Sequence, residues 1–293
     1  MPVYQNKYTT WNGEYQPIFK RLLSFPRYSY MQLLGKRMVH MVFVSAWLPF
    51  ILFTVYIYAR VNVKLMESFN IPIGRLWEVD ARFFYVFLWA QVPFLLFFTI
   101  MVGPSLMSRD IRHKALPMIL SKPISRWEYI LGKYMVLFFL LSILSWFQGF
   151  LLFFFQTSAV SKFSTWRMEF WSESFWLLPK IFIFSLLTIT TLNLLVMALS
   201  CLTQNYRFAS TAIIMIIIGG FVVGGVATGI FRSHNWMCIS TMTCLASIGY
   251  QVFGLKNQTG LPSGLAWLSI LGLWGICILI LSWKTRAFQR FRE

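Results

Sequence analysis

The stretch Pro104–Lys133 reads PSLMSRDIRHKALPMILSKPISRWEYILGK and separates two long apolar runs. Its charged residues are six bases and two acids (Arg109, Arg112, Lys114, Lys122, Arg126, Lys133, Asp110 and Glu128). Apolar residues recur at three- and four-residue steps through its first half, which predicts a short basic amphipathic helix at 105–121 on a membrane surface. Either Ser105 or Ser108 can cap this helix, and Asp110 then falls in its first turn, where the helix dipole favours a carboxylate.

The second half of the stretch contains a break and a new start. Pro117 removes one backbone donor and should bend or shorten the first helix. The residue before Pro123 avoids the helical region, so the helix should stop there. Ser125 and Glu128 have capping-box spacing, which predicts that a new helix begins at Arg126 and continues into the next apolar run. The alternative interpretation is an ordinary cytoplasmic loop that fixes orientation by its positive charge alone.

The rest of the chain is dominated by runs of this apolar kind. Six are long enough to span a bilayer (39–59, 83–103, 134–155, 178–200, 210–231 and 264–283). Each has about 20 residues, enough to cross a hydrocarbon core of about 30 Å as a helix. We therefore expect an all-α membrane protein: a cytoplasmic tail and interfacial helix at 1–38, a six-span domain at 39–283, and a cytoplasmic tail at 284–293.

Composition supports a membrane protein and argues against a nucleic-acid partner. Apolar residues make up 58% of the 293 residues, and the formal net charge is +17. The basic residues are spread over short loops between apolar runs, which is typical of a polytopic membrane protein in a lipid bilayer. The four cysteines are scattered without metal-type spacing and indicate no disulfide framework. The polar N-terminus before the first run does not resemble a cleaved signal peptide.

The distribution of basic residues predicts the orientation. The two termini and the second and fourth loops hold 17 of the 26 Lys and Arg residues, and the three other loops hold nine. Positive charge accumulates on the cytoplasmic side, so both termini should be cytoplasmic. Within the N-terminal segment, basic and apolar residues interleave from Ile18 to Met38, which indicates an interfacial helix broken near Pro26.

The fifth loop is long and largely apolar. Its segment Trp236–Phe253 is expected to form a short external or re-entrant helix, tolerated where protein covers its ends. A copper site is a second interpretation of its soft ligands (His234, Met237, Cys238, Met242 and Cys244). On one helix, however, Cys238 and Cys244 would point to different faces, so packing is the preferred interpretation.

The sequence lacks the motifs that are typical of several functional classes. No acidic or basic residue lies in the middle of a span, whereas ion-coupled transporters usually carry such groups. The chain has no phosphate-binding loop, because Gly132-Lys133 is followed by Tyr134. It also has no metalloprotease helix or nucleophile elbow. The chain is therefore not expected to be an enzyme, nor to bind a metal or cofactor itself.

Mild polar and small residues within the spans predict contacts between helices. Gln91 precedes Pro93 in the second span, so a bend is expected there. In the fifth span, Gly220 and Gly224 are four residues apart, as are Gly225 and Gly229. Such spacing permits close helix approach. Packing within one chain and a seam between two chains are both compatible with it.

Residues 109–133 resemble the loop of type-2 ABC exporter permeases. In that family an acidic residue opens the loop helix, and a Leu-x-x-Pro-Ile-Ser-Arg-x-x-Tyr-x-x-Gly-Lys stretch follows. The matching positions are Asp110, Leu120, Pro123, Ile124, Ser125, Arg126, Tyr129, Gly132 and Lys133. With Arg112, these residues are expected to couple the chain to an ATPase. The six-span layout, the N-terminal surface helix and the short helix before span six extend the resemblance to the whole chain.

The resemblance implies a function and a set of partners. The chain would be the permease of an ATP-driven exporter in a bacterial inner membrane, paired with an identical or homologous permease. Two copies of a separate ATPase would carry the ATP and magnesium. The translocation path or dimer seam would involve the second and fifth spans (Gln91, Phe94, Phe98, Gly220, Gly224 and Gly225). The alternatives are a non-transporting anchor and an intramembrane enzyme. The substrate stays open among lipids, drugs, peptides and pigments.

Overall fold

The computed structural model describes residues 29–31, 33, 35, 37–62, 78–112, 126–161, 175–203 and 205–287. Within these ranges the protein is helical and contains no strand. Its elements are α2 (Arg37–Ser45), α3 (Leu48–Val61), α5 (Ala81–Arg112), α7 (Arg126–Leu144), α8 (Trp146–Ser161), α10 (Leu177–Leu202), α11 (Tyr206–Phe231), η2 (His234–Ile239), α12 (Thr241–Phe253) and α13 (Ser263–Ala287).

Among the described residues, six segments are long and apolar enough to cross a membrane (Arg37–Val61, Ala81–Arg112, Trp127–Ala159, Leu177–Leu202, Tyr206–Phe231 and Ser263–Lys284). Each contains one of the spans predicted from sequence, so the expected number of six is confirmed. Two of them are interrupted by a turn. Ala46 and Trp47 separate α2 from α3, and Ser145 separates α7 from α8. The chain is thus a multi-pass membrane protein by the length and composition of its helices.

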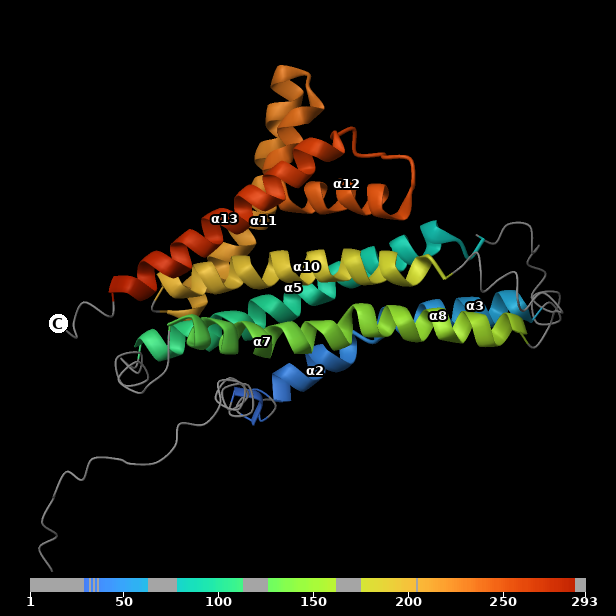
Figure 1. The fold of residues 1–293 in the computed structure, drawn as a ribbon, viewed down its shortest axis with the longest axis horizontal. Coiled ribbons are helices and arrows are strands. Elements are labelled where there is room, and N and C mark those ends of the chain that lie inside the picture. The colour runs from blue at the N-terminus through green and yellow to red at the C-terminus, as the bar shows by residue number, and fades with distance from the viewer. Residues whose placement is uncertain are drawn as a thin grey trace, which may run out of the picture.

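Helix α10 lies at the centre of the bundle. It contacts α5, α7, α8, α11, α12 and α13. In its most apolar stretch, 72% of the residues are buried inside the bundle, against 17% in the corresponding stretch of α11. Figure 1 shows α5 and α10 side by side, with α7 and α8 following one another along the same direction. The ends of α5, α10 and α13 and the beginnings of α7 and α11 lie together at the left of Figure 1. We call this side of the molecule the α5–α7 end.

Aromatic side chains fill the opposite part of the bundle. Phe84, Phe87, Phe153 and Phe184 are fully buried there, and they come from α5, α8 and α10. The ring of Tyr85 on α5 lies 4.7 Å from that of Tyr250 on α12, centroid to centroid. Aromatic contacts of this kind pack large apolar area with defined geometry. They fix α12 against the bundle.

The segment expected to form one helix at 236–253 consists of two pieces. The 3₁₀ helix η2 ends at Ile239, and α12 begins at Thr241. The break falls at Ser240 because its side chain accepts a hydrogen bond from the Thr243 N–H at 3.3 Å and caps α12. Gly254, with φ of 72°, ends α12 in the left-handed conformation that glycine adopts without strain. Whether this segment is external or re-entrant stays a prediction.

The predicted cap at Ser105 or Ser108 is wrong. Helix α5 runs without interruption from the second span to Arg112, so both serines are helix-interior residues. The sequence signal failed because a serine followed by an aspartate looks the same whether a helix begins there or continues. The start of α7 at Arg126 is confirmed. The remainder of the predicted loop helix (113–121), residues 18–28 of the N-terminal helix and the C-terminal residues 288–293 lie outside the described ranges.

Candidate functional site

A compact polar site with an ion pair lies between the described end of α5 and the first turns of α7. Lys133 Nζ is 2.9 Å from Asp110 Oδ2, and the Tyr129 hydroxyl donates a hydrogen bond of 2.8 Å to the same carboxylate oxygen. The Lys133 ammonium also lies 5.8 Å from the centre of the Tyr129 ring. One carboxylate oxygen therefore receives two donors, which are themselves in contact. We call these three residues the Asp110 cluster.

Helix geometry explains how the Asp110 cluster forms. Tyr129 and Lys133 are four residues apart on α7 and so lie on one face of that helix. Asp110 lies near the far end of the described part of α5, not in a first turn as the sequence suggested. The ammonium of Lys133 and the hydroxyl of Tyr129 stabilise the charge of this partly buried carboxylate.

The surroundings of the Asp110 cluster are apolar. Tyr129 is 1% exposed, and the side chains of Lys133 and Asp110 are 12% and 22% exposed. Buried residues from three helices cover the site (Met107, Met197, Ala198, Cys201, Cys277 and Leu281). Electrostatic attraction is stronger in such surroundings than in water. The cluster therefore ties the end of α5 firmly to the first two turns of α7.

A second polar contact binds α5 to α10 about two turns earlier. The Ser200 hydroxyl donates to the Pro104 carbonyl at 3.1 Å and accepts from the Ser108 N–H at 3.2 Å. The Pro104 carbonyl and the Ser108 N–H are the acceptor and the donor of one i to i+4 position of α5. The Ser108 hydroxyl in turn donates to the Ser200 carbonyl at 3.0 Å, in the last turn of α10. Ser200 Oγ thus contacts both backbone groups of this turn of α5.

Pro104 explains why a third serine is needed nearby. Proline has no N–H, so the carbonyl of Ile100 loses its intrahelical donor. The Ser210 hydroxyl of α11 lies 3.1 Å from this carbonyl and 3.0 Å from the Tyr206 carbonyl of its own helix, so its one proton is shared between two acceptors. Serines from α10 and α11 therefore contact the backbone on both sides of Pro104. We call Ser108, Ser200 and Ser210 the serine contacts of α5. Sequence reasoning missed them, although the unsatisfied carbonyl before Pro104 was a usable signal.

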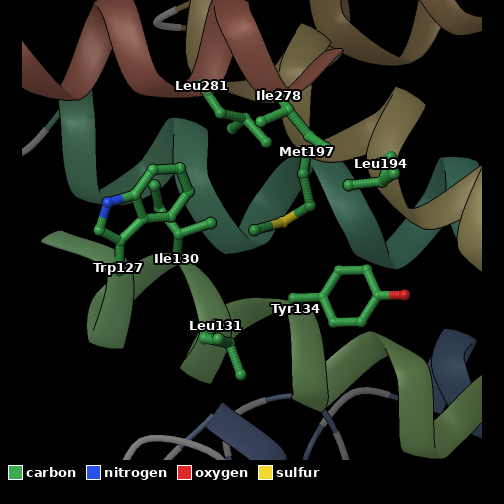
Figure 2. A pocket seen from close by; sticks show the side chains of 8 residues that line it. All are labelled: Trp127, Ile130, Leu131, Tyr134, Leu194, Met197, Ile278 and Leu281. Atoms are coloured by element: carbon green, nitrogen blue, oxygen red, sulfur yellow. The ribbon is translucent and has the colours of Figure 1, made fainter. Parts of the chain in front are cut away.

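Beside the Asp110 cluster is an apolar cavity of about 150 Å³ between α7, α10 and α13. Figure 2 shows the eight side chains that line it (Trp127, Ile130, Leu131, Tyr134, Leu194, Met197, Ile278 and Leu281). The Tyr134 hydroxyl points away from the cavity in Figure 2, and it donates to Thr190 Oγ1 at 3.3 Å. The inner surface is therefore almost wholly hydrocarbon and sulfur.

The predicted path residues of the second span face the interior of the same chain. Gln91 Nε2 donates to Gln148 Oε1 at 2.6 Å, and both side chains are buried. Their other amide atoms have no hydrogen-bond partner among the described residues. Phe98 is fully buried in the central core, and Phe94 packs partly buried against it. These positions lie between helices of one subunit in the structure of the single chain.

The glycines of α11 divide into two groups. A Cβ on Gly220 would lie 3.1 Å from the Ile239 carbonyl oxygen, and one on Gly224 would lie 3.3 Å from that of Trp236. Nothing lies within 4 Å of a Cβ on Gly225 or Gly229. For the first pair, the structure favours the interpretation of packing within one chain, because η2 approaches them closely.

The residues expected to couple the chain to an ATPase are placed as follows. Asp110, Tyr129 and Lys133 come together, Arg112 is exposed, Gly132 is buried, and Arg126 begins α7. Leu120, Pro123 and Ser125 lie outside the described residues. Within the described part of the chain, no three His, Cys, Asp or Glu residues are grouped as metal ligands would be. Cys244 instead donates its thiol to the Cys238 carbonyl at 3.2 Å.

Comparison with protein-family models and with curated proteins finds no match for the sequence. The class of the protein therefore follows from its own geometry. It is an all-helical, multi-pass membrane protein with six candidate spans. A partly buried ion-pair cluster joins its second and third spans.

Proposed function

We propose that this chain is the permease subunit of an ATP-driven ABC transporter that works as an exporter in a bacterial inner membrane. Two permeases, identical or homologous, pair with two copies of a separate ATPase, which binds ATP and magnesium. Both termini and the 113–125 loop face the cytoplasm. The support is the six-span layout, the positive charge of that loop, and its resemblance to the permease loop motif.

The observation that carries the proposal is the Asp110 cluster. The loop between α5 and α7 is the element that an ATPase would push. Its two ends are not independent, because Asp110 on α5 is paired with Lys133 and Tyr129 on α7. A displacement applied to the loop therefore moves both helices together. Without such a connection, the movement would dissipate at the first flexible residue.

The serine contacts of α5 provide the next step. Ser200 joins α5 to the central helix α10, and Ser210 joins it to α11. A displacement of Asp110 is therefore transmitted to α10 within two turns along α5, a distance of about 11 Å. The chain itself performs no covalent chemistry in this scheme. Its residues transmit movement and shape a path between the two permeases.

The proposal is tested by expressing the chain together with the ATPase encoded beside its gene. We expect the two proteins to purify as a complex whose ATP hydrolysis responds to the permease. Asp110→Asn and Arg126→Ala should leave the chain inserted in the membrane and lower this coupled hydrolysis. Glu78→Gln is the control, because Glu78 is exposed beside the start of α5, at the other end of the bundle.

Two outcomes would contradict the proposal. Failure of any ATPase to associate with the chain would remove the ABC assignment. Normal coupled hydrolysis in both loop variants would remove the loop from the mechanism. An ATPase that binds but neither responds to the permease nor supports export would indicate a membrane anchor instead. Hydrolysis of a substrate by the chain alone would indicate the intramembrane enzyme.

A further inference from the structure

We propose that the cavity between α7, α10 and α13 binds one acyl chain of an anionic phospholipid, with the headgroup held near Lys284 and Trp127. The inference depends only on the chain being a membrane protein and not on the transport function proposed above. It rests on the lining of the cavity, its size, its opening and the charge at one end.

The lining selects an apolar ligand. Met197 and Leu281 are buried at its base, 0% and 2% exposed, and Ile130 is 8% exposed. The Tyr134 hydroxyl is engaged with Thr190 and points away (Figure 2). A polar ligand would find no partner inside, and burying its polar groups would be unfavourable. An apolar cavity of about 150 Å³ stays free of water and accepts hydrocarbon.

The cavity is too small to admit a whole helix of a partner protein. A helix with its side chains is about 10–12 Å across, whereas this cavity holds about 150 Å³. Its α7 wall extends from Trp127 to Tyr134. Seven residues of helix rise about 10 Å, which suits part of one acyl chain. Single extended hydrocarbon chains are the ligands of this width in a bilayer.

The opening faces the membrane. Leu131 and Ile278 are 42% and 43% exposed and stand on two of the three lining helices. Both belong to candidate membrane spans, so their exposed surface meets lipid. A lipid chain can therefore enter sideways from the bilayer without opening the bundle.

The charge at the α5–α7 end selects an anionic headgroup. Lys284 follows Leu281 by one turn on α13 and interacts electrostatically with Cys201, one turn beyond Met197 on α10. Lys284 thus lies beyond the cavity, toward the α5–α7 end of the bundle. The nearby carboxylate of Asp110 is already paired with Lys133. Trp127, 55% exposed, provides the amphipathic ring that is typical of the interfacial layer.

The experiment uses the full chain in bilayer nanodiscs and two photoactivatable lipids with identical acyl chains. One is phosphatidylglycerol, which is anionic, and the other is phosphatidylcholine, which is zwitterionic. Peptide mapping after illumination locates the adducts. We expect phosphatidylglycerol to label the α7, α10 and α13 peptides that line the cavity, in preference to phosphatidylcholine.

Two matched pairs of variants test the site. Ile278→Trp should cover the cavity and abolish this labelling, whereas Leu279→Trp adds the same ring one residue away, at a position that is 67% exposed and outside the lining. Lys284→Gln should lower the preference for phosphatidylglycerol about fivefold, the effect of one cation near a lipid surface. Lys180→Gln is its control, near the start of α10 at the opposite end.

The results test the cavity site and the headgroup preference separately. Unchanged labelling of the cavity peptides in Ile278→Trp would overturn the site. Equal labelling of the native chain by the two lipids, or an undiminished preference in Lys284→Gln, would overturn the anionic headgroup. Size-exclusion profiles identical to the native chain establish that each variant is folded, so a loss of labelling reports on the site.

Discussion

At the scale of single residues, Tyr129 occupies the most constrained position of the Asp110 cluster. Its ring is buried, and its hydroxyl reaches a carboxylate on another helix. Lys133 reaches the same oxygen from one turn further along α7. The two donors are not equivalent. Removing the hydroxyl leaves the ion pair intact, whereas removing the ammonium leaves a partly buried carboxylate without its counter-ion.

Substitutions in the cluster should therefore differ in cost. Tyr129→Phe removes one hydrogen bond to a charged acceptor and should lower the free energy of unfolding by about 1.5–3 kcal/mol. Lys133→Met should cost more, because it leaves the partly buried Asp110 carboxylate without its counter-ion. Thermal unfolding in detergent measures both. In Lys133→Met, the further change Asp110→Asn should restore part of the loss, because it removes the uncompensated charge. A Lys133→Met variant less affected than Tyr129→Phe would contradict this ranking.

At the scale of helices, α5 combines features that normally end a helix with a length of 32 residues. Pro104 lies well inside it, and the missing donor would usually shorten or kink the helix. The helix continues because neighbouring serines contact its backbone around the proline. Ser210 Oγ contacts the Ile100 carbonyl, and Ser200 Oγ contacts the Pro104 carbonyl. Neighbouring helices in membranes satisfy freed backbone groups in this way.

This arrangement predicts a coupling between two distant positions. Ser210→Ala should cost about 0.6 kcal/mol in the native sequence, a typical interhelical hydrogen bond in membranes. In a Pro104→Ala background the alanine N–H satisfies Ile100 itself, so the same substitution should cost almost nothing. A double-mutant cycle on thermal stability measures the difference. Thr211→Ala is the control, because its hydroxyl bonds only to carbonyls of its own helix. Equal costs in both backgrounds would show that Ser210 does not serve the proline.

The glycines of α11 allow a second prediction about elements. Gly224→Leu must displace η2, since the Trp236 carbonyl already lies 3.3 Å from the position of a Cβ. A Cβ on Gly225 has no neighbour within 4 Å among the described residues. We expect Gly224→Leu to increase protease cleavage around residues 232–240 without changing the dimer fraction in mild detergent. Gly225→Leu should leave cleavage unchanged, and it should lower the dimer fraction if a second permease packs on the open glycines. The reverse pattern would place the intermolecular contact at Gly224.

Sequence predicted some of these elements and missed others for definite reasons. The spans and the start of α7 depend on local information, namely apolar length and the Ser125–Glu128 spacing. The Asp110 cluster was named residue by residue through a family resemblance, but its ion pair was not foreseen. The contact of Ser200 with Pro104 joins positions 96 residues apart and has no local signature. The same holds for Gly224, whose neighbour could be any backbone.

At the scale of the whole molecule, the arrangement of helix ends bears on orientation. The described ends of α5, α10 and α13 lie at one side of the bundle, as alternate passage of successive spans requires (Figure 1). The segments expected at this side carry most of the basic residues. Together these features favour a cytoplasmic α5–α7 end.

The orientation can be measured with single cysteines. In a background without the four native cysteines, Ser121→Cys and Asn257→Cys should react with a membrane-impermeant thiol reagent from opposite sides. The expected cytoplasmic side is that of Ser121, because it lies in the loop with the most basic residues. Reaction of both positions from the same side would refute the six-span layout, whereas reversed sides would refute only its orientation.

The position of Ser200 limits how the bundle can deform. Its hydroxyl accepts from one α5 backbone group and donates to another. Sliding α10 along α5 by even one residue would break both bonds at once. Shear between these two helices is thus blocked, while tilting of the pair as a unit is not. Helices α5 and α10 therefore behave as one rigid pair, and a gap in the bundle must open along the borders of this pair with the surrounding helices.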